Sequence, residues 1–212
     1  MEKPAAPPPR NRSPGSSLRK LKGEAAHCTN CPLYRNATQT VFGEGPANAR
    51  VVFVGEQPGD QEDLAGKPFV GPAGKMLDRA MADAGIDRRT VYVTNAVKHF
   101  KWVPRGKRRL HQKPDAREIG ACRPWMTGEF SAIRPLVAVC LGATAAQAVM
   151  GSKAKVMRDR GKLLESSFAK YTVLTVHPSY LLRAPDEKSR RENYKLFVAD
   201  LRVVAKVLEN EE

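Results

Sequence analysis

The amino-acid sequence predicts an α/β fold: a three-layer α/β/α sandwich around a central, mostly parallel four-stranded sheet. Two observations predict it. Short apolar runs typical of buried strands recur four times along the chain, and segments with helical spacing separate them. Strands that alternate with helices form a parallel sheet that is covered on both faces.

The expected strands are the apolar runs at 50–55, 90–95, 135–142 and 171–177. The expected helices cover 74–86, 115–133, 142–150 and 187–209. In the first of these helices the apolar residues fall on one face, and Gly85 is placed to end it.

The N-terminal segment, residues 1–17, holds five prolines and very few residues that a core can bury. Such a segment cannot offset the entropy lost on ordering, so we expect it to be disordered. Residues 18–212 contain no repeat and no clear linker. We therefore expect one domain, because this length suits a single hydrophobic core.

The charge balance is strongly basic. The chain has 36 Lys and Arg against 22 Asp and Glu, a net charge of +14. A field of this sign attracts polyanions, and nucleic acid is the polyanion that we expect. The sequence has no apolar run of about 18 residues and no signal-peptide pattern, so we expect a cytoplasmic protein that does not enter a membrane.

Polar or glycine-rich sequences follow three of the expected strands: GEQPGD from 55, TNAVKH from 94 and HPSYLLR from 177. In open parallel sheets, ligands bind beyond the carboxyl ends of the strands. The three segments therefore predict a ligand site at one edge of the sheet. The alternative for the first segment is a simple turn made by Gly55, Pro58 and Gly59.

Four cysteines suggest a metal site. Cys28 and Cys31 form a C-x2-C pair, and Cys122 and Cys140 follow far downstream with 17 residues between them. In an intracellular chain this pattern favours metal over disulfides, and zinc or a four-iron cluster are both compatible with it. The alternative is that Cys140 is a buried strand residue and Cys122 a helix residue.

The stretch RGKRRLHQKP, residues 105–114, holds four cations in its first five positions and then His111. Taken alone, it predicts a loop that grips phosphates and in which His111 is one more polar surface group. A family resemblance changes this interpretation.

The segments VGEQPGDQEDLAGKPFVGPAG, YVTNAVKHFKW and HPSYLLR, together with the four cysteines, resemble the uracil-DNA glycosylase superfamily, in its iron-sulfur, family 4-like branch. The resemblance runs from about Leu21 to the C-terminus. GEQPG and KRRLH are closest to the X-type enzymes (UdgX), which remove uracil and stay covalently bound to the DNA. The resemblance implies a 4Fe-4S cluster with a structural role, held by Cys28, Cys31, Cys122 and Cys140.

The resemblance also implies a uracil pocket. Phe69 stacks on the extruded base, Asn95 pairs with its O4 and N3-H, and His177 stabilises the leaving anion at O2. The backbone amide of Gln57 adds a donor. Without the resemblance, Phe69 would be a core anchor and Asn95 a turn former at a strand end.

For the sugar, Glu56 is expected to stabilise the cation and to orient a nucleophile. In the X-type interpretation His111 replaces water and bonds to C1′. Its neighbouring cations are expected to hold phosphates and to disfavour protonation of the imidazole. These cations are Lys107, Arg108 and Arg109.

The segment from Ser179 to Arg183 is expected to press into the DNA. Leu181, Leu182 or Arg183 would fill the space that the base leaves. The expected protein is thus a monomeric, single-turnover uracil-DNA glycosylase that accepts single-stranded DNA. The alternatives are a multiple-turnover iron-sulfur glycosylase that uses water, and a non-catalytic, metal-stabilised DNA-binding protein.

Overall fold

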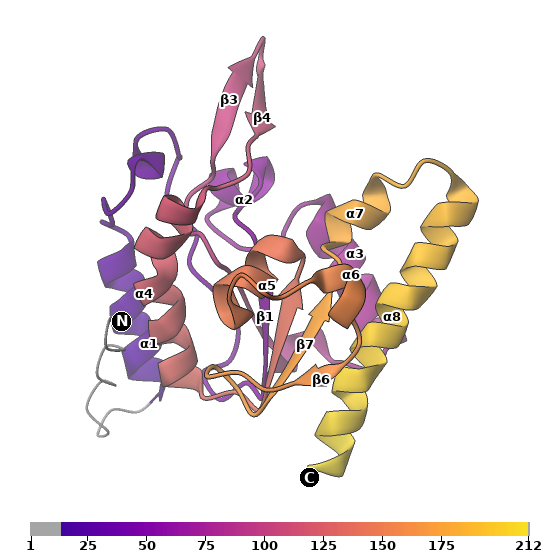
Figure 1. The fold of residues 1–212 in the computed structure, drawn as a ribbon. Coiled ribbons are helices and arrows are strands. Elements are labelled where there is room, and N and C mark those ends of the chain that lie inside the picture. Colours follow the sequence, from indigo (N-terminus) through magenta and orange to yellow (C-terminus); the bar gives the residue numbers. More distant parts are fainter. Residues whose placement is uncertain (1–13, 212) are drawn as a thin grey trace.

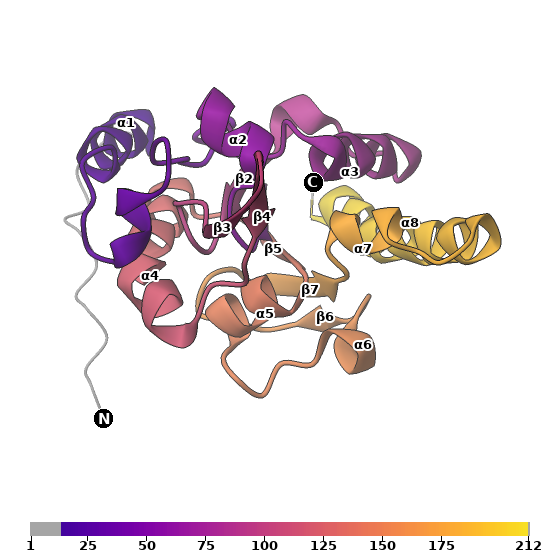
Figure 2. The same cartoon turned by 90° about the horizontal axis from the view of Figure 1, so that it is seen from above.

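The computed structural model describes residues 14–211, and it has the expected α/β architecture (Figure 1). Its main sheet has the strand order β2-β1-β5-β7-β6. The strands are β1 (Val51–Gly55), β2 (Tyr92–Asn95), β5 (Val137–Leu141), β6 (Leu163–Leu164) and β7 (Tyr171–Thr175). Seen from above, α3 (Pro72–Asp83) and α8 (Glu187–Asn210) lie on one side of this sheet and α5 (Ala143–Met150) and α6 (Val156–Asp159) on the other (Figure 2).

The four expected strands are present and pair in parallel, but the prediction of a four-stranded sheet was wrong by one strand. β6 adds an antiparallel edge strand beside β7. It has only two residues, too few for any periodic pattern to show in the sequence. Every residue of β1 and of β5 is buried, as apolar strands covered on both faces require.

All four expected helices are present. Their ends lie within two residues of the expected ends, except that the helix expected at 74–86 ends three residues early, at Asp83. The helices are α1 (Pro14–Ala25), α2 (Asp60–Ala65), α3 (Pro72–Asp83), α4 (Ala116–Ile133), α5 (Ala143–Met150), α6 (Val156–Asp159), α7 (Pro178–Leu182) and α8 (Glu187–Asn210), with 3-10 turns η1 (Pro32–Arg35) and η2 (Arg88–Thr90). None of these helices is long and apolar enough to cross a membrane.

The N-terminal boundary differs from the expectation. α1 begins at Pro14, inside the segment 1–17 that we expected to be disordered, while residues 1–13 lie outside the described part of the chain. α1 packs against α4. This contact gives α1 a partner that the composition of its own segment could not reveal.

The basic stretch is a β-hairpin and not a loop. β3 (Trp102–Arg105) and β4 (Arg108–His111) pair antiparallel, and the ribbon projects from the domain (Figure 1). Gly106 takes a positive φ of 58° in the two-residue turn, a conformation that glycine adopts without strain. His111, opposite Trp102, therefore lies at the foot of the ribbon.

Candidate active site at the carboxyl edge of the sheet

Four parallel strands end at one edge, and each contributes a polar group there. Glu56 follows β1, Asn95 ends β2, Thr144 opens α5 after β5, and His177 follows β7. The strand register places Gly55 opposite Asn95. Backbone hydrogen bonds then join the segments that follow β1 and β2. Ala96 N donates to Gly55 O at 2.9 Å, and Val97 N donates to Glu56 O at 3.0 Å.

Phe69 is held over this edge in a conformation that a bulky residue rarely adopts. Its φ is 57°, in the left-handed region. A Cβ at Gly74 would collide with the Phe69 backbone oxygen, and a Cβ at Gly55 with the Phe69 ring and Asn95 Oδ1. The ring centroids of Phe69 and His177 are 6.2 Å apart, with the planes 30° from parallel. Because Gly55 and Gly74 have no side chain, the Phe69 ring can lie close to Asn95 and His177.

Asn95 is only 3% exposed, and its side-chain amide makes no hydrogen bond with any described residue. Its backbone carbonyl is fixed, because it accepts a hydrogen bond of 2.9 Å from the Nζ of Lys98. A fixed residue with a free amide offers one donor and one acceptor side by side. This is the hydrogen-bonding pattern that a pyrimidine edge can match.

His177 has a defined tautomer. Its Nδ1 accepts a hydrogen bond of 3.2 Å from the Ser179 backbone N-H and lies 2.8 Å from the Ser179 hydroxyl. Nδ1 therefore carries a lone pair, and in the neutral ring Nε2 carries the proton. Burial, reinforced by Arg183 and His111, lowers the pKa of His177 to about 4. At neutral pH the ring is an uncharged donor.

Ser179 Oγ lies 2.8 Å from His177 Nδ1, so it helps to orient that ring, and its expected contact with DNA stays a prediction. The structure corrects the expectation for Leu181. Leu181 is 0% exposed and belongs to the core, so it is not available to fill a vacated base position. Leu182 and Arg183 are exposed, and so is Tyr180, which the sequence analysis did not single out.

His111 and Glu56 meet at the mouth of this site. His111 Nε2 lies 3.4 Å from Glu56 Oε1, and Thr144 Oγ1 donates to the other oxygen of Glu56. Burial lowers the pKa of His111, Glu56 acts against this, and Arg183 reinforces it. The net shift favours the neutral imidazole, and burial is its main cause. We had expected the hairpin cations to contribute, but the contributing cation is Arg183, which directly follows α7.

The hairpin cations divide into two kinds. Lys107 and Arg108 are exposed at the tip, where they remain available for phosphates. Arg109 is not available. It pairs with Asp60 Oδ1 at 2.5 Å and with the fully buried Asp63 Oδ2 at 2.6 Å, and its guanidinium lies over the rings of Phe100 and Trp102. The predicted DNA-binding role of Arg109 is therefore corrected: it anchors the ribbon to α2.

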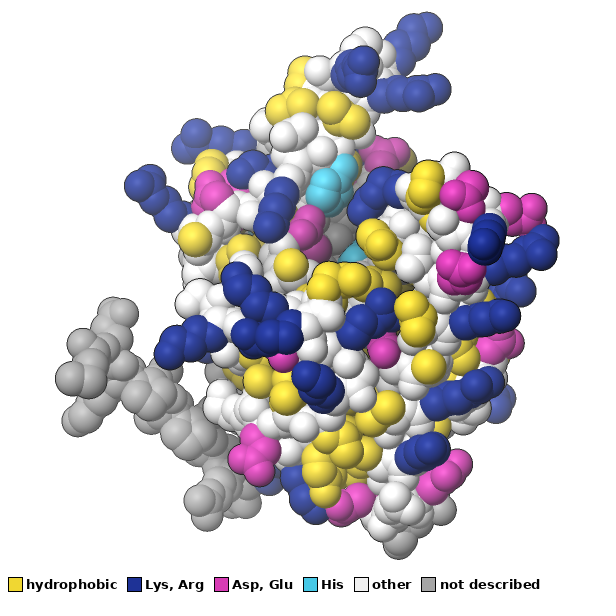
Figure 3. All heavy atoms as spheres, turned by 45° about the vertical axis from the view of Figure 1, so that its right-hand side comes forward, with side chains coloured by type: hydrophobic (Ala, Val, Ile, Leu, Met, Phe, Trp, Pro, Cys, Tyr) yellow, Lys and Arg dark blue, Asp and Glu magenta, His cyan; other side chains and the backbone are white. Residues whose placement is uncertain are grey.

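A hollow lies below the ribbon on this face of the molecule. Figure 3 shows one histidine side chain at the foot of the projecting segment and a second deeper in the hollow, with Lys and Arg side chains around its rim. The side chain of Gln57 does not face this hollow. It is bonded to the backbone of residues 101 and 112, so only its backbone amide remains for the expected uracil contact.

Three of the four cysteines form a second site, beside α4. Cys31 and Cys122 pack with Val97 in one buried cluster, and Trp125 Nε1 donates to Cys28 Sγ at 3.1 Å. Burial raises the pKa of the Cys31 thiol, and it raises that of Cys122 to about 11. A bound cation would reverse these shifts, because thiolate is the ligand form.

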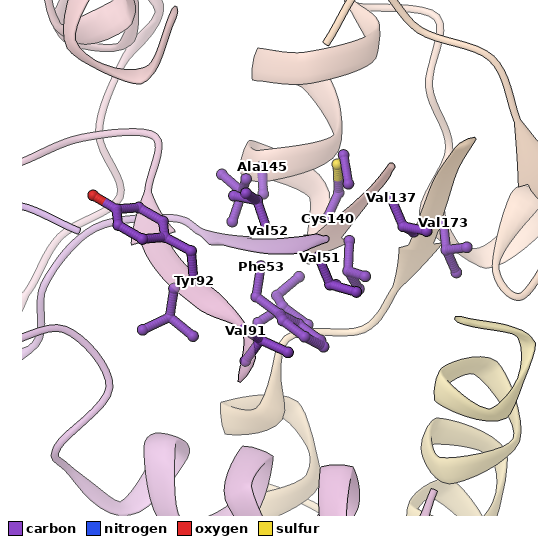
Figure 4. Packing of buried hydrophobic residues seen from close by; sticks show 14 of the residues in the cluster. Val51, Val52, Phe53, Val91, Tyr92, Val137, Cys140, Ala145 and Val173 are labelled. Atoms are coloured by element: carbon purple, nitrogen blue, oxygen red, sulfur yellow. The ribbon is translucent and has the colours of Figure 1, made fainter. Parts of the chain in front are cut away.

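Cys140 does not belong to this group. It lies in the middle of β5, in register with Val54 and Leu174, and Figure 4 shows it among the side chains of the main core. Burial alone raises the pKa of its thiol. The prediction of Cys140 as a ligand is therefore corrected, because an inner strand of a covered sheet faces only core.

His99 is a ligand candidate that the sequence analysis missed. It is buried, and it follows Val97 and Lys98, which line the three cysteines. Thr40 gives its only hydrogen to Ala25 O at 2.9 Å, so it accepts from His99 Nε2 at 2.9 Å. The neutral ring then has a lone pair on Nδ1, which is buried and has no partner among the described residues. His99 ends the segment TNAVKH, which we interpreted only as a polar strand end, and nothing in that sequence marks it as a ligand.

A buried ion pair joins the two sites. Lys98 Nζ lies 2.6 Å from Glu129 Oε2, with 1% and 0% of the side chains exposed. The backbone N of Lys98 donates to Cys122 Sγ at 3.2 Å, and its Nζ holds the Asn95 carbonyl. Among the described residues, no three His, Cys, Asp or Glu side chains are arranged for a single metal ion.

Comparisons with known proteins agree with this geometry. Residues 42–202 match the family described as the uracil DNA glycosylase superfamily. The chain is 41% identical over 165 residues to a type-4 uracil-DNA glycosylase of Thermotoga maritima, covering 77% of this chain and 82% of that protein. It is 36% identical over 184 residues to a type-4 uracil-DNA glycosylase of Archaeoglobus fulgidus, covering 84% and 89%. With its strand-end pocket and this extent of similarity, the chain belongs to the uracil-DNA glycosylase superfamily.

Proposed function

We propose that this protein excises uracil from DNA and becomes covalently attached, through His111, to C1′ of the sugar that remains. One observation carries the proposal: a half-exposed imidazole stands beside the Glu56 carboxylate, at the mouth of a pocket formed by Phe69, Asn95 and His177. The names of the type-4 relatives support the excision, and the hairpin supports the attachment.

The pocket groups suit an extruded uracil. The Phe69 ring offers a face for stacking, and the free Asn95 amide pairs with O4 and N3-H. The Nε2-H of His177 donates to O2, where negative charge gathers as the base departs. A donor aimed at developing charge in a closed site stabilises the transition state by several kcal/mol, about 3 in measured cases.

At the sugar, the C1′–N1 bond breaks and its electron pair leaves with uracil. A lone pair of the His111 imidazole forms the new N–C1′ bond, and the proton on the other ring nitrogen passes to a base. Glu56 is the base at hand, and its negative charge also stabilises the cationic sugar. An alkylated imidazole is a poor leaving group, so each protein molecule acts once.

The DNA contacts follow from exposure. Lys107 and Arg108 at the ribbon tip bind phosphates that flank the target. Leu182 or Arg183 fills the position that the base leaves. We propose that single-stranded DNA is accepted and that the protein acts as a monomer, which suits an enzyme that scans DNA.

For the cofactor, we propose that Cys28, Cys31, Cys122 and the Nδ1 of His99 hold a 4Fe-4S cluster. Three thiols and one unpartnered imidazole nitrogen suit such a group, which here supplies a crosslink between the N-terminal segment and the sheet. The test compares His99→Ala with Cys140→Ala. Iron content and visible absorbance should fall in the first variant and stay in the second; the reverse result would restore Cys140 as the ligand.

The activity test mixes the protein with a labelled uracil-containing single-stranded oligonucleotide, boils it in SDS and compares a thymine control. The proposal predicts a uracil-dependent band that survives boiling and is absent for His111→Ala. No band, but strand breakage after alkaline heating, would mean a multiple-turnover glycosylase that uses water. Neither band nor breakage would leave a DNA-binding protein.

A further inference from the structure

We infer that the side-chain amide of Gln57 is a positioning group that sets the foot of the β3–β4 ribbon so that His111, and not water, reaches C1′. The inference rests on the covalent function proposed above. It assigns to Gln57 a role different from the uracil contact that its sequence motif suggested.

The amide of Gln57 joins both strands of the ribbon at its base. Its Nε2 donates to Lys101 O at 3.2 Å and to Gln112 O at 3.0 Å, and its Oε1 accepts from Lys101 N at 3.1 Å. Gln112 N donates to Lys101 O at 2.9 Å, which closes the ladder at the same place. With only 6% of Gln57 exposed, solvent does not compete for these bonds.

Two consecutive residues of one loop thus meet two consecutive residues of the ribbon. Glu56 faces the imidazole of His111, and Gln57 holds the backbone of Gln112, the next residue. The loop itself is fixed to the sheet, because Val97 N donates to Glu56 O. The amide therefore sets the distance between the sheet edge and the backbone that carries His111.

The other anchors do not hold the backbone of residue 112. Arg109 binds α2 two residues before His111, and Trp102 Nε1, opposite His111 at the foot, donates to Asn36 O at 2.9 Å. Without the Gln57 amide, the backbone that follows His111 can shift while these side-chain contacts remain. A displacement of about 1 Å costs on the order of 10²-fold in the rate of an oriented attack.

Loss of the attack by His111 does not stop base departure in this scheme, because the pocket groups come from other elements. Water then meets the sugar cation: its oxygen bonds to C1′, its proton passes to Glu56, and a free abasic site results. The measurable quantity is therefore the ratio of adduct to free abasic product for each uracil released.

The experiment compares Gln57→Met with Gln39→Met under single-turnover conditions. Gln39 is a matched control, because its Nε2 also donates to two backbone carbonyls, Asp63 O at 3.0 Å and Leu64 O at 3.1 Å, which belong to α2 and not to the ribbon. We expect the wild-type ratio for Gln39→Met and a ratio lowered by about tenfold or more for Gln57→Met.

A second variant guards against misfolding. Gln57→Glu keeps an acceptor for Lys101 N but turns an oxygen toward two carbonyls, so we expect its ratio to fall as well. A wild-type ratio in a folded Gln57 variant would overturn the inference. A wild-type protein that releases uracil without forming adduct would overturn the proposed covalent function, and with it this inference.

Discussion

The two histidines of the site stand on very different supports. His177 follows an inner strand of a five-stranded sheet, and Ser179 fixes its ring. His111 ends a strand of a two-stranded ribbon, and 49% of its side chain is exposed. The first is a stationary donor built into the core of the fold. The second is a reactive group that an added element delivers.

This difference has a physical consequence. An isolated two-stranded hairpin is marginal in water, so the ribbon depends on its anchors, whereas β7 is buried on both faces. Mutations at the ribbon should change which nucleophile reacts, and mutations at the strand end should change how fast the base leaves.

The largest expected effect is the loss of the nucleophile. His111→Ala should abolish the SDS-resistant adduct completely, because among the described residues no other imidazole lies within ion-pair distance of Glu56. Uracil release should persist, since water can take the vacated position. Free uracil is measured by chromatography. Loss of adduct and of uracil release together would contradict the separation.

At the strand end, His177→Ala should slow uracil release by about 10²- to 10³-fold, because it removes the donor to the leaving anion. Ser179→Ala is the matched control. It keeps the backbone N-H that holds Nδ1, so its effect should be much smaller. Single-turnover rates distinguish the two, and equal effects would show that the Ser179 hydroxyl, not the backbone, sets the tautomer.

For the ribbon anchor, Arg109→Met leaves the buried Asp63 without its cation, which should cost about 3 kcal/mol of stability. Amide hydrogen exchange should rise across 102–111 and stay slow across 171–175. Exchange that rises equally in both segments would mean that the ribbon and the sheet open as one unit.

The smallest effect is that of pH. His111 must be neutral to attack, and its pKa lies below the ordinary 6.5, so adduct formation should be flat near pH 7 and fall as pH drops through the lowered value. His177, with a pKa of about 4, should stay neutral over this range. The ratio of adduct to uracil released should therefore fall on acidification, and a constant ratio would contradict the assignment.

The sequence predicted the sheet well, because long apolar runs of β-branched residues have a strong signal. The sequence analysis missed β6, which is too short to show a pattern. It interpreted the ribbon as a loop, because the cations obscured Val103 and Leu110, which pair across the two strands. Strand-end motifs predicted that Glu56, Asn95 and His177 meet at one edge of the sheet, whereas Phe69 was expected there only from the family resemblance.

The errors arose where partners lie far apart in the chain. Arg109 was placed on DNA because its carboxylate partners, Asp60 and the buried Asp63, come 49 and 46 residues earlier. Cys140 was taken as a ligand from the four-cysteine pattern and the family resemblance, although it lies inside an apolar run. His99 was overlooked because an unpartnered nitrogen is visible only in three dimensions.

The central claim is that His111 forms the covalent bond, and peptide mapping tests it most directly. The protein is reacted with a uracil-containing oligonucleotide, treated with nuclease and protease, and sequenced by mass spectrometry. The account predicts a deoxyribose remnant on the peptide that contains His111, localised to the imidazole. A remnant on Glu56, on a lysine or on no peptide would contradict it.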